Sequence, residues 1–507
     1  MTDVKVAIVG TGFSGLGMAA RLKREGIEDF VVLERNQEVG GTWWDNTYPG
    51  CQCDVASRLY SFSFAPNPDW SRTYSRQSEI RDYLRDCSER FGLRPHIRFG
   101  CEVRSASWDE EQGVWRIETS NGEVRAEALV AGMGPLSEPA PPDIPGLDRF
   151  EGKVFHSARW DHEHDLSGER VGVIGTGASA IQFVPRIQPE VGSMHVFQRT
   201  PPWILPHTDR PVTRLERRIY RAFPALQRLA RTGVYLSREW LVLGLTHRRR
   251  LMKLPEAIAR RHLARQVRDR ELRRKLTPNY TIGCKRILLS NTWYPALSKP
   301  NVDVVTDGIS EVRGSSVVTG AGEEIELDTL ILGTGFRVTD LPAANNLIGR
   351  DGRTLAETWQ GSPQAYMGSS IPGFPNFFML LGPNTGLGHN SVVYMIEAQV
   401  AHVMRCLRAK AERGAVAIEA REEALAEWNA EIQRFLAGSV WNAGGCKSWY
   451  IDRTGRNTTI WPRFTWQFRR SARRFDPAAY RFLGGRGAAG DDAGDEGAEL
   501  VGRPLAA

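Results

Sequence analysis

The residues of this 507-residue chain that are best suited to chemistry begin with a glycine-rich turn near its start. Gly10, Gly12 and Gly15 follow a strand-like apolar run at residues 4–9 and lead into a helix-like segment. Glycines at this spacing permit a tight turn and let the backbone approach a pyrophosphate at the positive end of a helix. Glu34 ends the next apolar run, 24 residues after Gly10, where a carboxylate accepts hydrogen bonds from ribose hydroxyls. We predict a dinucleotide site here; the alternative is a glycine turn in an unrelated α/β fold.

A second glycine turn repeats this arrangement further along the chain. Gly175 and Gly177 follow another apolar run, and Ala180 replaces the third glycine, an allowed variant where helix and strand pack closely. Arg199 stands 24 residues after the first of these glycines, the offset that the acidic residue has in the first motif. A carboxylate there suits a free ribose 2′-hydroxyl, whereas an Arg suits a 2′-phosphate. We therefore predict FAD at the first turn and NADPH at the second, unless Arg199 is a surface residue that merely ends a strand.

Two dinucleotide sites in one chain favour hydride passage from a nicotinamide to a flavin, because a dehydrogenase needs only one. The elements that must position these sites alternate as strand-like apolar runs and helical or turn-rich stretches, which indicates an α/β fold. The strand-like runs lie at residues 4–9, 30–33, 128–131, 171–174, 194–197 and 329–332. The expected fold class is α/β, with two Rossmann-like dinucleotide-binding domains, for FAD and NADP, and a helical insertion.

The insertion is expected at residues 213–276, where Leu, Ile and Ala recur at helical spacing among many Arg. Residues 211–275 hold 19 Lys and Arg against 5 Asp and Glu, a net +14, so the rest of this +7 chain is net negative. Such a basic segment could bind nucleic acid, an acidic membrane surface or a polyanionic cofactor. We favour solvated helix faces that also attract NADPH, and we expect no nucleic-acid partner.

The overall composition, 41% hydrophobic and 25% charged, is ordinary for a globular protein and excludes wholesale disorder. The Pro-rich segment at residues 137–146 suits a linker. The predicted division is 1–148 for the first part of the FAD domain, 149–208 for the first part of the NADP domain and 209–278 for the insertion. The NADP domain would continue at 279–338 and the FAD domain at 339–482. The Gly-, Ala- and Asp-rich tail, 483–507, carries too little apolar surface to fold.

Seven Cys, an odd number at scattered positions, predict no disulfide framework and favour a reducing, cytoplasmic location. The first residues show no signal segment, and no run of eighteen apolar residues predicts a transmembrane helix. His162 and His164 have no further potential metal ligands near them at the usual spacing, so we predict no metal. The oligomeric state is left open.

Between the two glycine turns lies a more specific pattern. Phe150, Gly152, His156, Trp160 and Asp161 match F-x-G-x-x-x-H-x-x-x-W-[P/D] in full. This is the fingerprint of the Baeyer–Villiger monooxygenases, flavoproteins of the flavin-containing monooxygenase superfamily, and the chain resembles that family to about residue 474. The resemblance implies an enzyme that uses NADPH and O2 to convert a ketone to an ester or lactone through a C4a-peroxyflavin.

Two further segments resemble the family and imply its catalytic pair. Residues 40–54 match a motif that wraps the flavin and ends in Asp54. Residues 283–286 resemble the segment that brings an active-site Arg, here Arg286, over the flavin. Arg286 would stabilise negatively charged oxygen, because guanidinium stays charged at any working pH, and Asp54 would hold its orientation.

The resemblance also implies other cofactor contacts. Lys285 and Thr200 match residues that hold the 2′-phosphate, although Lys285 could be a plain surface residue. Further residues predicted to bind a cofactor are Ser14, Thr42, Trp43, Gln52, Tyr60 and Ser179.

Alternative functions remain open. A heteroatom monooxygenase, oxidising amines or sulfides, would keep both glycine turns but usually lacks the closing Trp160-Asp161 pair. A flavoprotein reductase with a redox Cys pair is less favoured, because Cys51 and Cys53 are separated by one residue, not by two or four. An NADPH-sensing regulatory protein would have no use for Arg286.

Overall fold

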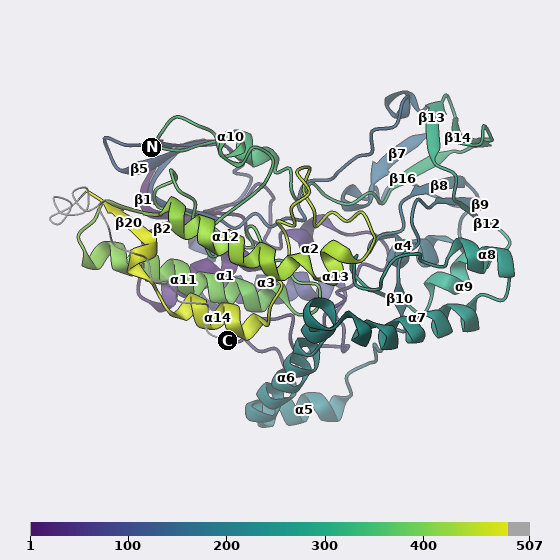
Figure 1. Cartoon of the computed structure of the whole chain (residues 1–507), viewed down its shortest axis with the longest axis horizontal. Helices are drawn as coiled ribbons and strands as arrows, with labels where there is room; N and C mark the ends of the chain where they lie inside the picture. The colour runs from purple at the N-terminus through teal and green to yellow at the C-terminus, as the bar shows by residue number, and fades with distance from the viewer. Residues whose placement is uncertain (1, 485–507) are drawn as a thin grey trace.

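The computed structural model describes residues 2–484 and contains two large sheets (Figure 1). The first has the strand order β17-β4-β5-β6-β1-β2-β3, and β18 also pairs with β6. The pairs that join β18, β6, β1, β2 and β3 are parallel, and β4, β5 and β6 pair antiparallel. The strands are β1 (Thr2–Val9), β2 (Phe30–Leu33), β3 (Ile97–Arg98), β4 (Val103–Asp109), β5 (Val114–Thr119), β6 (Gly122–Ala131), β17 (Leu347–Ile348) and β18 (Phe377–Met379).

The second sheet is parallel throughout, in the order β12-β9-β8-β16-β7. It comprises β7 (Lys153–His156), β8 (Arg170–Ile174), β9 (Ser193–Phe197), β12 (Val302–Val305) and β16 (Thr329–Leu332). All six runs expected to be strands belong to these two sheets. Their residues are almost wholly apolar because parallel strands are covered on both faces.

The two chain crossings between the sheets run side by side. The main chain of Ala140, in the expected linker, donates to Gly335 O (2.9 Å), and Arg337 N donates to Glu138 O (2.9 Å). The Thr334 hydroxyl also donates to Ala140 O, at 2.6 Å. One of these two crossing segments directly follows β16. Together, the two hydrogen-bonded segments form a paired crossing that connects the two sheet domains.

The helical insertion expected from the sequence is present. It contains α5 (Arg214–Ala222), α6 (Pro224–Glu239), α7 (Lys253–Gln266) and α8 (Arg270–Lys275), with short turns at Leu243–His247 and Arg249–Met252. Thr213 and Glu216 form a capping box that starts α5, as Thr and Glu three residues apart do before a helix. In Figure 1, α5 and α6 extend from the lower edge of the molecule.

The C-terminal part returns to the first sheet. Helix α11 (Val392–Glu412) packs on α1 (Phe13–Arg24) and on α14 (Thr465–Arg473). Strand β20 (Tyr480–Leu483) pairs with β19 (Ala417–Ala420). The expected tail therefore begins too early, because Leu483 pairs with Ala417 in this ribbon; residues 485–507 lie outside the described part.

The remaining elements connect these layers. The helices are α2 (Thr42–Asp45), α3 (Gln77–Arg90), α4 (Ala180–Ile187), α9 (Trp293–Leu297), α10 (Leu355–Trp359), α12 (Glu422–Ala437) and α13 (Val440–Ala443). The strands are β10 (Ile204–Leu205), β11 (Leu288–Leu289), β13 (Ile309–Arg313), β14 (Ser316–Thr319) and β15 (Glu324–Glu326). Short 3-10 turns lie at Arg94–His96, Leu147–Arg149, Ser157–Arg159, Pro342–Asn345 and Pro477–Ala479. No helix among residues 2–484 is both long and apolar enough to cross a membrane.

One disulfide corrects the expectation drawn from the cysteines. Cys284 and Cys446, 162 residues apart, are bonded, with their Cα atoms 6.2 Å apart. No local spacing of cysteines predicts this bond, because only the tertiary fold brings the two segments together. It attaches the segment that carries Lys285 and Arg286 to the loop after α13. The other five cysteines are buried and free.

This disulfide predicts the behaviour of the thiols. Protein unfolded without reductant should expose five reactive thiols, and seven after reduction, as measured by thiol titration. Cys446→Ser should lower the unfolding free energy by about 2–4 kcal/mol. The matched control is the double variant Cys284→Ser/Cys446→Ser, which should lose no more than the single variant. Additive losses, or seven thiols before reduction, would contradict the bond.

Candidate active site

The first glycine turn is shaped for close approach by a ligand. Gly10 has a φ of +94°, and a Cβ on Gly15 would lie 1.8 Å from Gly10 O, so both positions require glycine for the turn itself. Gly12 is different, because the nearest atom to a Cβ there would be Gly41 Cα, at 3.7 Å. Gly12 also precedes α1, whose N-terminus receives no side-chain cap. An open glycine beside uncapped N–H groups fits a pyrophosphate.

Glu34 lies where the sequence places it, at the end of β2, and is buried. Its Oε2 accepts hydrogen bonds from Thr11 N (2.8 Å) and Thr11 Oγ1 (2.6 Å), and its Oε1 accepts one from Asn36 N (2.8 Å). A carboxylate has about four acceptor positions, so these contacts leave capacity for a ribose hydroxyl. Glu34 therefore also braces the glycine turn, a role that its sequence offset does not reveal.

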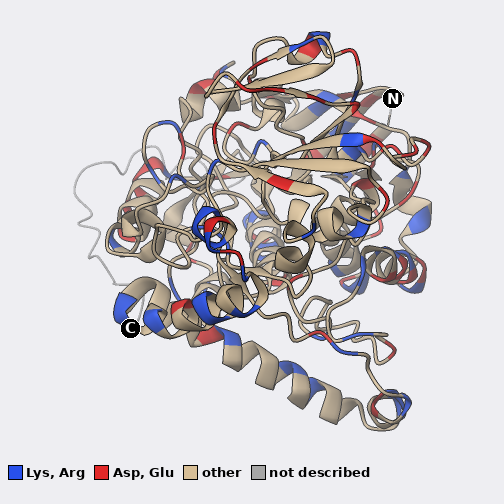
Figure 2. Cartoon of the chain, turned by 90° about the vertical axis from the view of Figure 1, so that its right-hand side faces the viewer, with Lys and Arg blue, Asp and Glu red and all other residues tan. Residues whose placement is uncertain are grey.

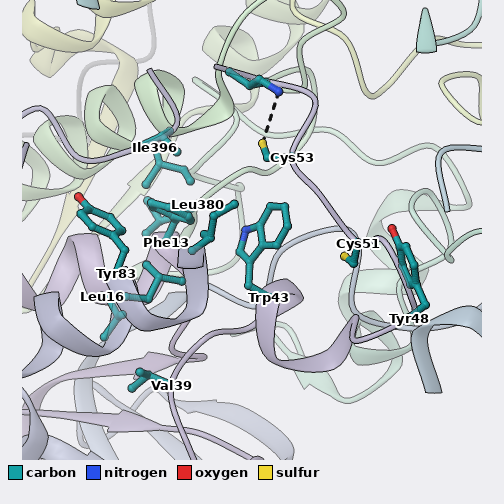
Figure 3. Packing of buried hydrophobic residues seen from close by; sticks show 14 of the residues in the cluster. Phe13, Leu16, Val39, Trp43, Tyr48, Cys51, Cys53, Tyr83, Leu380 and Ile396 are labelled. Carbon is teal, nitrogen blue, oxygen red and sulfur yellow. Dashed lines mark hydrogen bonds between the residues drawn. The ribbon is translucent and has the colours of Figure 1, made fainter. Parts of the chain in front are cut away.

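The segment that resembles a flavin-wrapping motif folds directly over this turn. A Cβ on Gly41 would lie 2.9 Å from Gly12 Cα, so the two glycines are in backbone contact. Thr42 begins α2, and the Trp43 indole N–H donates to the Tyr60 hydroxyl at 3.2 Å. Figure 3 shows Trp43 in the buried cluster that also includes Phe13 of α1.

Ser14 and Gln52, also predicted to contact a cofactor, are placed differently. Ser14 is buried in the first turn of α1. The Gln52 side-chain amide donates within the protein, to Tyr74 O (2.8 Å) and to Asp209 Oδ2 (3.0 Å). Gln52 therefore bridges segments of the protein. Gln182 of α4 also bonds the Gln52 main chain, accepting from its N–H at 3.1 Å and donating to its carbonyl at 2.9 Å.

The second glycine turn has the same construction. Gly175 has a φ of +105°, and a Cβ there would lie 2.4 Å from Gly333 O. Gly177 is again the open position, with its nearest neighbour 4.0 Å from the site of a Cβ. Ala180 is fully buried at the start of α4, against Gly333, and Ser179 precedes the helix without capping it. A second anion site at a helix N-terminus is thus available.

Two cations lie beside this second turn. Arg199 is exposed just after β9, followed by half-buried Thr200. Burial lowers the pKa of Lys285, and the charge of nearby Arg199 lowers it further. The Lys285 ammonium also lies 5.4 Å from the centre of the Tyr280 ring. Two neighbouring cations with no carboxylate between them fit a phosphate dianion.

Arg286 and Asp54 form a bidentate ion pair. The guanidinium donates from Nε to Asp54 Oδ2 and from Nη2 to Asp54 Oδ1, each at 2.5 Å. Burial alone would raise the pKa of Asp54, but the charge and hydrogen bonds of Arg286 lower it; Asp54 in turn raises the pKa of Arg286. The side chains remain 33% and 26% exposed. Arg286 Nη1 has no hydrogen-bond partner in the described part, so it is available to a ligand.

Tyr450 and Arg238 were not expected at this site. The Tyr450 hydroxyl is buried and has no hydrogen-bond partner among residues 2–484. Burial raises the pKa of Tyr450 to about 12, against the nearby charge of Arg286, so the phenol is a neutral donor at ordinary pH. Arg238 of α6 donates to Tyr74 Oη at 3.1 Å, and its charge also favours ionised Asp54. No local spacing in the sequence connects these residues to Arg286. The adjacent aromatic residues Trp449 and Tyr450 are only a weak signal of a binding site.

The fingerprint residues lie in and beside β7 of the second sheet. Phe150 is buried, and Gly152 has no room for a Cβ, which would lie 2.2 Å from Asp328 O. Trp160 packs edge-on against Phe155, with ring centres 5.1 Å apart, and Asp161 pairs with Lys153 at 2.6 Å.

His156 ends β7, beside the paired crossing. Its Nδ1 accepts from Ala158 N (3.1 Å), and its Nε2 is buried without a partner in the described chain. Burial lowers the pKa of His156 to about 4, so the ring is neutral near pH 7. A neutral, packed imidazole argues for a structural role and against proton transfer.

Cys51 and Cys53 are unsuited to redox exchange. Both thiols are free and buried in the core cluster that Figure 3 shows. Burial raises the pKa of Cys51 to about 12 and raises that of Cys53 as well, so neither supplies a thiolate. Residues 2–484 also contain no group of three or more His, Cys, Asp or Glu arranged to hold a metal ion.

Comparisons with known proteins show the family of this chain. The family described as pyridine nucleotide-disulphide oxidoreductase matches residues 7–234. The chain is 53% identical over 504 residues to a Baeyer-Villiger monooxygenase of Streptomyces coelicolor, covering 98% of this chain and 97% of that one. It is 52% identical over 478 residues to a Baeyer-Villiger monooxygenase of Pseudomonas aeruginosa, covering 94% and 91%. This chain belongs to the Baeyer–Villiger monooxygenase family.

Solved structures support the same conclusion. A steroid monooxygenase bound to NADP has a TM-score of 0.84 and 33% identity, covering 96% of this chain and 100% of that one. The closed crystal structure of cyclohexanone monooxygenase has a TM-score of 0.85 and 29% identity, covering 95% and 99%. A complex of OTEMO with FAD and NADP has a TM-score of 0.82 and 25% identity, covering 95% and 99%. The family, the α/β fold and the class of flavin-dependent monooxygenase expected from the sequence are confirmed.

The open glycines give a test of the two cofactor sites. Gly12→Ala should leave the fold intact but reduce bound flavin, because its methyl group occupies the path of approach. Gly177→Ala should keep flavin and raise KM for NADPH roughly tenfold or more, which corresponds to about 1.4 kcal/mol. The measurements are the flavin-to-protein absorbance ratio and steady-state kinetics. Gly15→Ala is the contrasting variant, since its Cβ would overlap Gly10 O and should prevent folding. Normal flavin content in Gly12→Ala would contradict the assignment.

The buried His156 predicts a pH dependence of stability. The unfolded chain binds a proton at His156 below about pH 6.5, whereas the folded chain does so only below about pH 4. Stability should therefore fall as the pH drops through this window, by up to about 3 kcal/mol from this group. His156→Asn keeps an acceptor for Ala158 N and should flatten the fall, measured as melting temperature against pH. His162→Asn, at an exposed histidine, is the matched control and should retain the wild-type slope.

Proposed function

We propose that this chain uses FAD, NADPH and O2 to insert one oxygen atom into a ketone, giving an ester or lactone. The observation that carries the proposal is the bidentate Arg286–Asp54 pair, next to the segment that folds over the first glycine turn. The expectation of FAD and NADPH is supported by relatives solved with these cofactors. A cytoplasmic location is part of the proposal: five of the seven cysteines are buried and free, although the Cys284–Cys446 bond is unusual for a reducing compartment.

Each cofactor has a set of residues to hold it. FAD would lie on the open Gly12 and the N-terminus of α1, with Glu34 toward its ribose and residues 40–60 over it. NADPH would lie on Gly177 and the N-terminus of α4, with its 2′-phosphate between Arg199 and Lys285. The bound flavin supplies the oxygen activation that no side chain provides. The predicted division into FAD and NADP domains is supported by the two large sheets, because the first contains β1 to β6, β17 and β18 and the second contains β7, β8, β9, β12 and β16.

Arg286 supplies a permanent positive charge to the reaction. Asp54 raises its pKa and occupies Nε and Nη2, which fixes the plane of the guanidinium and leaves Nη1 for the reacting oxygen atoms. A preorganised cation stabilises negative charge as it develops on oxygen, without the cost of reorienting water. The ketone oxygen becomes negative when its carbonyl carbon is attacked, so the same group serves substrate and oxidant.

Tyr450 complements Arg286 as a neutral donor. Its buried hydroxyl is protonated at working pH and lacks a partner among the described residues. A buried donor without a partner is costly, and a substrate or cofactor oxygen would relieve that cost. We assign Tyr450 to orienting the oxygen that Arg286 stabilises.

Activity on ketones tests the proposal directly. NADPH oxidation by purified holoenzyme under air should rise on addition of cyclic, linear or aryl ketones, with products one oxygen atom heavier. Label from ¹⁸O2 should enter the ester or lactone. Oxidation of amines or sulfides with no ester from any ketone would favour the heteroatom alternative, and NADPH oxidation without oxygenated product would favour a reductase.

Arg286 provides the decisive variants. Arg286→Ala should leave flavin reduction by NADPH measurable but lower ester formation about a hundred- to a thousandfold, the usual effect of losing one such donor. Arg286→Lys should recover little, because an ammonium cannot make the two-pronged contact with Asp54. Stopped-flow flavin reduction and product analysis separate the two steps. Ester formation at the wild-type rate in Arg286→Ala would refute the assignment.

A further inference from the structure

Helix α6 in the insertion presents its apolar side to solvent. Leu226, Leu229, Leu236 and Trp240, at the end of the helix, are between 45% and 69% exposed. Their spacing of three, seven and four residues puts them on one stripe of the helix. A surface helix normally turns such a stripe toward the core. The outward stripe is therefore unexplained by folding.

The opposite side of α6 is polar and attached to the body of the protein. Gln227 donates to Asn67 O at 2.6 Å, and Arg231 donates to Arg58 O at 2.7 Å. Glu239 is buried and accepts from Thr465 N at 3.0 Å and from Thr465 Oγ1 at 2.6 Å. These contacts fix the rotation of the helix, so its apolar stripe is held outward.

Other exposed apolar side chains belong to the same insertion. Of the fourteen large hydrophobic residues that are exposed within residues 2–484, ten lie between positions 215 and 258. Helices α5 and α6 form the lower edge of the molecule in Figure 1. Exposed apolar residues that gather in one region mark an interaction site more often than scattered single residues do. Outside α6, the members are Leu215, Phe223, Leu241, Leu251, Leu254 and Ile258.

A basic cleft lies next to α6, beside Tyr235 on the side of the helix that faces the body of the protein. It has a volume of about 420 Å³ and is lined by Tyr394, Trp466, Arg469, Arg470, Arg473 and Arg474. Tyr235 of α6 stacks on Tyr394, with ring centres 4.9 Å apart, which places the cleft beside the helix. None of the four Arg forms an ion pair with a described residue. Figure 2 shows Lys and Arg along the same lower helices.

We propose that the outward stripe of α6, with the arginine cleft near the C-terminal end of the same helix, docks onto an anionic phospholipid bilayer. Leu and Trp side chains would enter the interface between headgroups and acyl chains, and the cleft would hold a lipid phosphate. From the sequence we favoured solvated helix faces, but exposure to water does not stabilise apolar Leu and Trp side chains. Nucleic acid would not use the apolar stripe, and pairing of two copies would bring two segments of net +14 together.

Vesicle binding by the holoenzyme tests this proposal without depending on turnover. Co-sedimentation should occur with vesicles of phosphatidylcholine and phosphatidylglycerol and be far weaker with phosphatidylcholine alone. About 1 M salt, at which the Debye length is about 3 Å, should weaken it. Leu229→Glu/Leu236→Glu and, separately, Arg470→Ala/Arg473→Ala should each reduce affinity roughly tenfold or more. Brominated lipid should quench Trp fluorescence, and Trp240→Phe should lose part of that quenching.

Val416→Glu, at an exposed apolar residue outside the helical insertion, is the matched control and should bind as wild type. Unchanged melting temperatures would show that the variants fold. The proposal is overturned by equal binding to neutral and anionic vesicles, by no binding, or by binding that the Leu variants do not weaken. Lipid-free dimerisation that Leu229→Glu/Leu236→Glu abolishes would assign the face to a second copy and overturn it too.

Discussion

The ion pair between Arg286 and Asp54 is the constraint on which the rest of the structure depends. Asp54 belongs to the segment that folds over the first glycine turn, and Arg286 follows β10 and the insertion, 232 residues away. The pair forms only when the two sheet domains meet in one orientation. The Gln52–Gln182 contacts and the paired crossing at Ala140 and Gly335 maintain that orientation from other directions. The position of the Arg286 guanidinium therefore depends on how the two domains dock.

The two predicted cofactor sites share the same construction, a glycine turn before a helix N-terminus. In each turn the first glycine has a positive φ and lies against backbone, while the second has open space beside it and precedes an uncapped helix. The charge differs just after the second strand of each motif, where Glu34 braces the first turn and Arg199 lies near Lys285 at the second. We therefore expect this charge reversal within a repeated fold to discriminate between the two cofactors.

Local patterns in the sequence were sufficient to predict the two turns, six strands of the two large sheets, the helical insertion and the family fingerprint, because each of these is encoded in a short stretch of sequence. Contacts that close over longer distances were missed. The Cys284–Cys446 bond and the position of Tyr450 beside Arg286 result from packing of remote segments. The resemblance did bring Asp54 and Arg286 together, and the structure places them in contact. The roles of these residues stay predictions until variants are measured.

Helix α6 shows why its amphipathic pattern misleads when read alone. The periodicity of Leu226, Leu229, Leu236 and Trp240 suggests burial, yet buried hydrogen bonds from its other face turn these residues outward. Polar contacts of that face reach other segments of the protein, including Tyr74 through Arg238, whose charge favours ionised Asp54. One side of the helix is therefore held against the body of the protein, and the other is exposed. Because buried polar groups fix the rotation of the helix, we expect a substitution on one face to affect the other face only through those groups.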